Sequence, residues 1–62
     1  MTIEITLQVP EGVLISLNED PASFGDEVRM LAAVKLYELG QLSSGRAAQL
    51  AGVTRAELLL AL

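Results

Sequence analysis

The sequence predicts a mainly α-helical domain with one N-terminal β-strand, in which a long helix precedes a helix-turn-helix. Three observations lead to this prediction. Residues 2–9 alternate strictly between apolar and polar side chains, as a strand does. Residues 21–39 have helix signals at both ends, and residues 44–62 are predicted to form two short helices around a glycine. With 62 residues in all, we expect residues 1–62 to form a single small domain.

The predicted strand, residues 2–9, places all its apolar side chains on one face, because successive strand residues point to opposite faces. Thr, Glu and Gln side chains occupy the other face. A strand with few neighbours leaves unpaired backbone groups along its edges. We therefore expect it to pair with the same strand of a second protomer, with plain packing inside a monomer as the alternative.

Residues 10–18 are compatible with two conformations. Pro10 followed by Glu11 suits the first turn of a short helix. Gly12 as a turn residue would instead start a return strand, with the following aliphatic residues on one face. We favour the helical turn.

Residues 21–39 are predicted to form the long helix. Asp20 can cap it, Pro21 suits its first position, and Gly40 can close it in the left-handed conformation. Apolar residues cover several sides of this helix, which is normal when neighbours enclose it. A chain this short offers few neighbours, so we expect a dimer through the strand and the long helix. The expected interface residues are Ile3, Ile5, Leu7, Val28, Leu31 and Tyr37.

Residues 44–62 fit the spacing of a DNA-binding helix-turn-helix. Small residues would let the two helices cross closely, Gly52 would take a positive φ in the turn, and aliphatic residues would seal the seam. Thr54 and Glu57 have the spacing of a capping box at the start of the second helix. The alternative is a helical corner with the same packing needs and no nucleic acid. The matching positions are Ala47, Ala48, Ala51, Gly52, Val53, Leu58 and Ala61.

The DNA-contacting residues would lie at the starts of the two short helices. The second helix of such a unit enters the major groove with its first residues forward, which here are Thr54 and Arg55. Arg55 could read guanine or hold a phosphate. At the first helix, free amides near Ser44 and Gly45, with Arg46 beside them, would anchor a phosphate.

The leucines near residue 62 favour a protein partner rather than DNA. Leucines are poor readers of a DNA groove, and exposed apolar groups more often mark protein contacts. The alternative function is therefore a module that binds a toxin or a second copy of itself without recognising DNA. The residues expected to do so are Leu59, Leu60 and Leu62.

The net charge of −4 is divided unevenly along the chain. Residues 1–27 hold six acidic groups and no basic one, whereas residues 28–62 hold four basic and two acidic groups, which is +2. An acidic protein is a weak candidate for nucleic-acid binding, because phosphate contacts supply most of that affinity. All the basic residues nevertheless lie in the half that carries the helix-turn-helix pattern.

The chain has no Cys and no His. Catalytic Cys and His groups, a Ser-His-Asp triad and the usual zinc or haem ligands are therefore excluded. We expect a protein that is not an enzyme and that uses no metal or cofactor. The N-terminus lacks the pattern of a signal peptide, and the longest apolar stretches have five residues, against about 20 for a membrane span. We expect a soluble cytoplasmic protein.

Residues 31–55, LAAVKLYELGQLSSGRAAQLAGVTR, resemble the signature of a known group. It is the uncharacterised-protein-family (UPF) group of small prokaryotic predicted antitoxins that contain a helix-turn-helix. The opening alternating segment followed by Pro-Glu is also similar to the family pattern, so the resemblance covers nearly the whole chain. The sequence departs from it at Gln41, where the family often has Lys or Arg, and at Ala56 and Leu59, where an aromatic residue is common.

The resemblance implies a type II antitoxin. Such a protein would bind operator DNA as a homodimer, repress its own operon and neutralise a cognate toxin, for example a PIN-domain nuclease. Family members usually continue into a short acidic tail that would bind the toxin. The resemblance thus leads us to expect that this chain is a fragment, or a short form without neutralising capacity.

Overall fold

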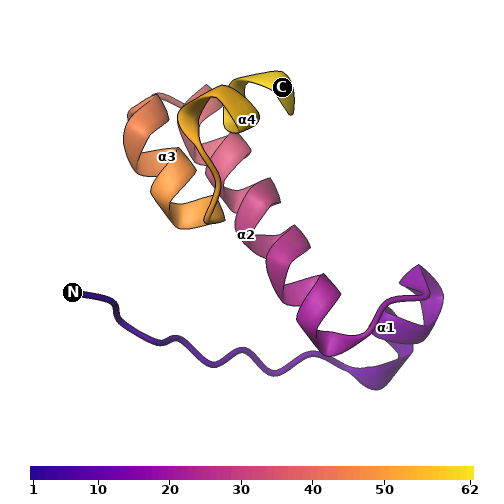
Figure 1. Ribbon diagram of the computed structural model, residues 1–62. Coiled ribbons are helices and arrows are strands. Elements are labelled where there is room, and N and C mark those ends of the chain that lie inside the picture. Colours follow the sequence, from indigo (N-terminus) through magenta and orange to yellow (C-terminus); the bar gives the residue numbers. More distant parts are fainter.

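The computed structural model describes residues 1–62 and contains four helices and no β-strand. The long helix α2 is the axis of the molecule; α3 and α4 pack at its C-terminal end, and α1 lies at its N-terminal end (Figure 1). Residues 1–10 form an extended N-terminal arm that precedes α1. The helices are α1 (Glu11–Leu17), α2 (Pro21–Glu38), α3 (Ser44–Ala51) and α4 (Arg55–Leu60).

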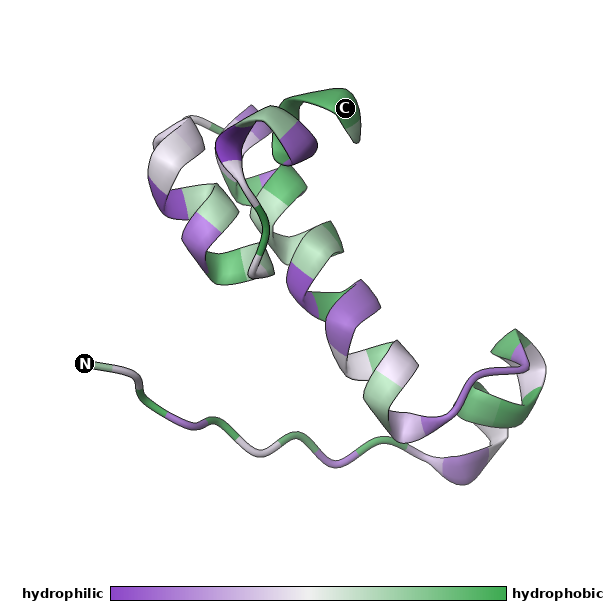
Figure 2. Ribbon diagram, viewed as in Figure 1, coloured by the Kyte–Doolittle hydropathy of each residue, from purple (hydrophilic) through white to green (hydrophobic).

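The predicted strand over residues 2–9 is wrong. The arm is extended, but no backbone group of residues 1–9 makes a backbone hydrogen bond, and a strand exists only when a neighbouring strand provides such bonds. The alternation that suggested the strand persists as alternating apolar and polar side chains along the arm (Figure 2). Its apolar side chains are largely uncovered, with exposed fractions of 80% for Ile3 and 79% for Ile5.

Of the two conformations considered for residues 10–18, the structure has the helix. α1 begins after Pro10, whose carbonyl accepts a hydrogen bond from the Val13 amide at 3.0 Å. It ends at Asn18, which takes the left-handed conformation with φ of 54°. None of its residues is buried, so α1 is a short surface helix that redirects the chain from the arm into α2.

α2 begins where its local sequence signals predict. The Asp20 carboxylate accepts a hydrogen bond from the Ser23 amide at 2.7 Å, and Pro21 occupies the first position. This backbone hydrogen bond also lowers the pKa of Asp20. The helix ends at Glu38, one residue before the predicted end, and Gly40 follows with φ of 75°.

The core is small and built mainly from alanine. It lies where α3 packs against both α2 and α4, and partly buried residues such as Met30 and Tyr37 surround it. Small side chains allow the helices to approach closely, and Leu58 is the one large residue that is completely buried. The fully buried residues are Ala33, Ala47, Ala48 and Leu58.

The chain by itself leaves much surface open. Its radius of gyration is 12.6 Å, whereas a compact domain of this length has a value of roughly 10.6 Å. Its accessible surface is 5006 Å², against about 3,900 Å² for a typical folded monomer of this mass. The excess comes from the arm and α1, which lie apart from the core (Figure 1). None of the helices combines the length and the apolar character needed to span a membrane.

Candidate nucleic-acid interface

The turn between α3 and α4 is closed by a recognisable helix-ending motif. Gly52 takes the left-handed conformation, with φ of 74°. The Val53 amide donates to the Ala48 carbonyl at 3.1 Å, and the Gly52 amide donates to the Gln49 carbonyl at 3.2 Å. This pair of bonds is the Schellman motif, which ends a helix and reverses the chain direction sharply.

The predicted packing residues form the seam of the two short helices, with one exception. Ala47 and Leu58 are fully buried, Ala48 is nearly so, and Val53 packs against them. Ala61, which the spacing also placed at the seam, is exposed and follows the last residue of α4. α4 is therefore a short helix of six residues, with the chain end outside it.

The N-terminus of α3 has the arrangement expected of an anion site, and Ser43 is its cap. The Ser43 hydroxyl accepts from the Arg46 amide at 3.1 Å, which leaves the amides of Ser44 and Gly45 without an acceptor in the chain. Ser44 is half-buried, whereas Gly45 and Arg46 are exposed. The guanidinium of Arg46 donates from Nη1 to Gln49 Oε1 at 3.0 Å, which holds it along α3.

The N-terminus of α4 is fixed by the predicted capping box. The Glu57 amide donates to the Thr54 hydroxyl at 3.1 Å, and the Thr54 amide donates to the Glu57 carboxylate at 3.1 Å. The latter bond lowers the pKa of Glu57, because it stabilises the ionised carboxylate. The Thr54 hydroxyl still has its proton to donate, and Arg55 is exposed beside it.

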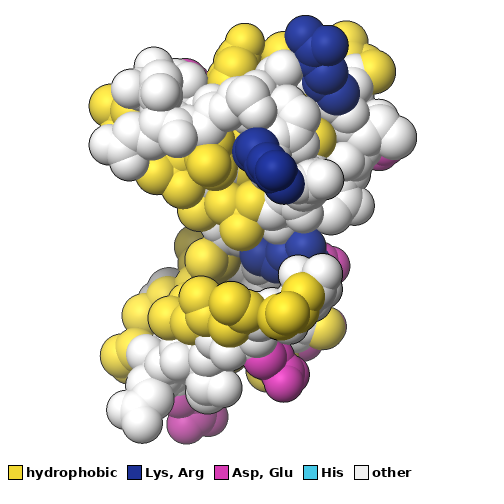
Figure 3. All heavy atoms as spheres, turned by 90° about the vertical axis from the view of Figure 1, so that its left-hand side faces the viewer, with side chains coloured by type: hydrophobic (Ala, Val, Ile, Leu, Met, Phe, Trp, Pro, Cys, Tyr) yellow, Lys and Arg dark blue, Asp and Glu magenta, His cyan; other side chains and the backbone are white.

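Charge is separated along the molecule. Lys and Arg side chains gather over the part of the surface formed by α3 and α4, whereas most Asp and Glu side chains in that view lie towards the opposite end (Figure 3). Three of the four basic residues belong to or touch the α3–α4 unit: Arg46 in α3, Arg55 in α4 and Arg29 against the end of α3. A negatively charged partner would therefore meet this end first.

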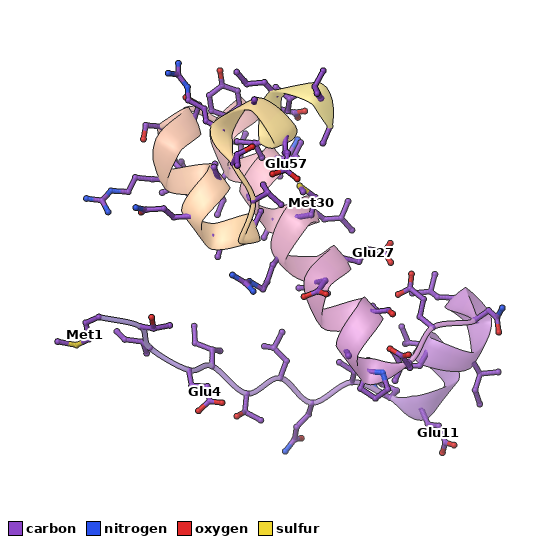
Figure 4. The ribbon with its side chains drawn as sticks, in the orientation of Figure 1. Met1, Glu4, Glu11, Glu27, Met30 and Glu57 are labelled. Carbon is purple, nitrogen blue, oxygen red and sulfur yellow. The ribbon has the colours of Figure 1, made fainter.

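The acidic end contains a pair of neighbouring carboxyl groups. Glu27 projects from α2 on the side of α1 (Figure 4), and its hydrogen bond to Glu19 is the main cause that raises the pKa of Glu19. Glu19 Oε2 is buried without a hydrogen-bond partner, and the charges of Glu27 and Asp20 add to the effect. No group of three or more His, Cys, Asp or Glu side chains is arranged to hold a metal ion.

The expected dimer residues fall into three places. The arm and one side of α2 enclose an apolar groove of about 810 Å³, and Glu4 points away from α2 (Figure 4). Leu31 is 60% exposed and lies outside this groove, and Tyr37 packs against the core instead. The predicted residues that line the groove are Ile3, Ile5, Leu7 and Val28.

A family model matches the whole chain, residues 1–62, and its description is "Uncharacterised protein family (UPF0175)". The chain belongs to the UPF0175 family. The match confirms the resemblance at the level of the family, whose description states no function. No curated protein and no solved structure matches this UPF0175 chain.

One contact at the α3–α4 turn of the UPF0175 chain involves a residue outside the predicted site residues. Arg29 in the middle of α2 donates from Nε to the Leu50 carbonyl of α3 at 2.8 Å. The two residues are 21 positions apart, so no local spacing rule connects them. The only feature of the sequence that could have pointed to this contact is the positive charge of Arg29 on a long helix that is otherwise largely apolar.

Proposed function

We propose that this UPF0175 protein is an antitoxin-like transcriptional regulator that binds its own operator DNA as a homodimer in the cytoplasm, and that it is a binding protein rather than an enzyme. The observation that carries the proposal is the α3–α4 unit. Its two helix N-termini each carry an exposed arginine, Arg46 and Arg55, on the basic end of the molecule.

The proposed contacts divide between the two helices. The free amides of Ser44 and Gly45 and the Arg46 guanidinium would hold a backbone phosphate. Thr54 and Arg55 would face the groove, where an arginine can bind guanine through two hydrogen bonds. The Glu57 carboxylate is held by the Thr54 amide and stays charged, so it works against a phosphate contact at this helix start.

The dimer is supported by the amount of open surface. The chain exposes about 1,100 Å² more than a typical monomer of its mass, and one side of a standard protein interface buries about 800 Å². The apolar side chains of the arm and of α2 line one groove, and a second copy offers the same apolar surface by symmetry. Light scattering at micromolar concentration should give twice 6.6 kDa, and a monomer would contradict the dimer.

DNA binding can be tested by fluorescence anisotropy with a labelled duplex from upstream of the gene, at several salt concentrations. Each phosphate contact contributes about 0.9 to the slope of log affinity against log salt. Replacing both Arg46 and Arg55 with alanine should weaken binding and reduce the slope by up to about 3.6, because a homodimer loses four arginines. Arg55→Ala alone is compared with Lys35→Ala, which also removes one positive charge but from α2.

Two results would contradict the DNA-binding proposal. One is the absence of binding by the wild-type protein even at low salt. The other is an unchanged affinity when Arg46 and Arg55 are replaced together.

A second candidate function is docking onto a toxin, for which the resemblance suggests a PIN-domain nuclease. The exposed leucines at the chain end favour it, since Leu60 is 87% and Leu62 54% exposed. Co-purification with a toxin encoded beside this gene should be lost in Leu60→Glu and retained in Lys35→Glu. Retention of the toxin by Leu60→Glu and Leu59→Glu would rule out this surface.

A further inference from the structure

Arg29 joins the long helix to the turn on which the proposed DNA contacts depend. Its Nε donates to the Leu50 carbonyl at 2.8 Å, and its guanidinium lies beside Gly52. We propose that Arg29 is a positioning residue: it holds the α3–α4 turn and thereby sets the direction in which α4 presents Thr54 and Arg55. The inference rests on the proposed function only for its effect on DNA binding.

The carbonyl that Arg29 binds is one that the turn itself does not satisfy. The last carbonyls of a helix have no partner within the helix. In α3 the backbone of the turn supplies donors to Ala48 and Gln49, and Arg29 supplies the donor to Leu50. A positive charge at the C-terminal end of a helix is also favourable for the helix dipole. Arg29 therefore completes the end of α3 from outside.

The guanidinium also occupies the open side of Gly52. A methyl group added at Gly52 would lie 3.1 Å from Nη2 and 3.5 Å from both Cζ and Nη1 of Arg29. The positive φ at this position requires glycine, and an added methyl group would also press against the guanidinium of Arg29, which would have to shift slightly. The residue after the turn begins the capping box of α4, so a shift of the turn moves the N-terminus of α4 directly.

Arg29 acts through the turn rather than as a reader of DNA. It belongs to α2, and the first residues of α3 and α4 are the ones that lead toward DNA in the proposed complex. Its Nε is already used by the Leu50 carbonyl. It also lines the apolar groove beside the arm, which is a different surface from the two helix N-termini.

The test compares three variants of the full chain. Arg29→Met keeps a long side chain but removes the donors and the charge, and Arg29→Lys restores the charge with a single ammonium donor. Lys35→Met is the matched control, because it removes one positive charge from the same helix. The structural readout is the exchange rate of the Gly52 and Val53 amides measured by NMR, which requires no DNA. The functional readout is anisotropy with the labelled upstream duplex.

We expect Arg29→Met to raise the exchange of the two turn amides about tenfold and to weaken DNA binding more than Lys35→Met does. Arg29→Lys should recover part of both effects. Unchanged turn exchange in Arg29→Met would overturn the inference, and so would equal losses of affinity in Arg29→Met and Lys35→Met. If the wild type binds no DNA while the exchange result holds, the proposed function fails and the role of Arg29 in the turn stands.

Discussion

Replacing Leu58 with alanine should nearly abolish the stability of the fold. Leu58 is the only large side chain that is completely buried, and the other fully buried residues are alanines, which cannot extend into the space it would leave. Buried Leu→Ala changes cost about 2.7–5 kcal/mol, since the cavity adds to the lost burial of the side chain. A 62-residue domain has a total stability of roughly 3–9 kcal/mol.

The measurement is urea and thermal unfolding followed by circular dichroism. In a domain of this size each kcal/mol corresponds to a Tm change of about 4–8 °C, so the expected loss exceeds about 10 °C. Leu60→Ala is the control, because Leu60 is 87% exposed and its replacement should change stability by less than about 0.5 kcal/mol. A Tm loss of only a few degrees in Leu58→Ala would refute the placement of the core at the α3–α4 seam.

Three further substitutions test backbone conformation and charge. In chemical unfolding, Gly52→Ala should destabilise the fold by about 1–2 kcal/mol or more, which is roughly the cost of an alanine in the left-handed conformation. Gly12→Ala should instead stabilise it by about 0.5–1 kcal/mol, because Gly12 lies within helix α1 and has open space around it. Equal effects at the two glycines would contradict the turn geometry. Folding raises the pKa of Glu19, so the folded state favours the protonated carboxyl. This contribution to stability is fully present below the ordinary pKa of 4.5 and is lost as the pH rises through the pKa of the folded state. Glu19→Gln should therefore raise the Tm at pH 7 relative to the wild type and give a much smaller difference near pH 4; an equal shift at both pH values would contradict the contact with Glu27.

The parts of the fold that the sequence predicts are those with local causes. Asp20, Ser43 and Thr54 each cap a helix through an amide three residues further on, so their signals lie within one turn of the sequence. The alternation in residues 2–9 is equally local, but a strand needs the backbone of another segment, and the chain supplies none. Pattern alone therefore identified an extended segment and not its partner.

The candidate site divides in the same way. The positions of Arg46 and Arg55 follow from helix starts that the sequence marks clearly. The contact of Arg29 with Leu50 depends on how α2 packs against α3, and no spacing within either helix encodes it. Tyr37 packs against the core of its own chain, which its spacing alone did not indicate, and its place in a dimer interface stays a prediction.

The packing of α3 against both α2 and α4 has a consequence for folding kinetics. The main packing contacts join helices that are neighbours in the sequence, so little chain entropy is spent in bringing them together. Domains with such local contacts fold in microseconds to milliseconds. Formation of a dimer is instead a bimolecular step whose rate depends on concentration. After rapid dilution from denaturant, helix content should return at once, whereas DNA binding should recover with a delay that shortens as protein concentration rises.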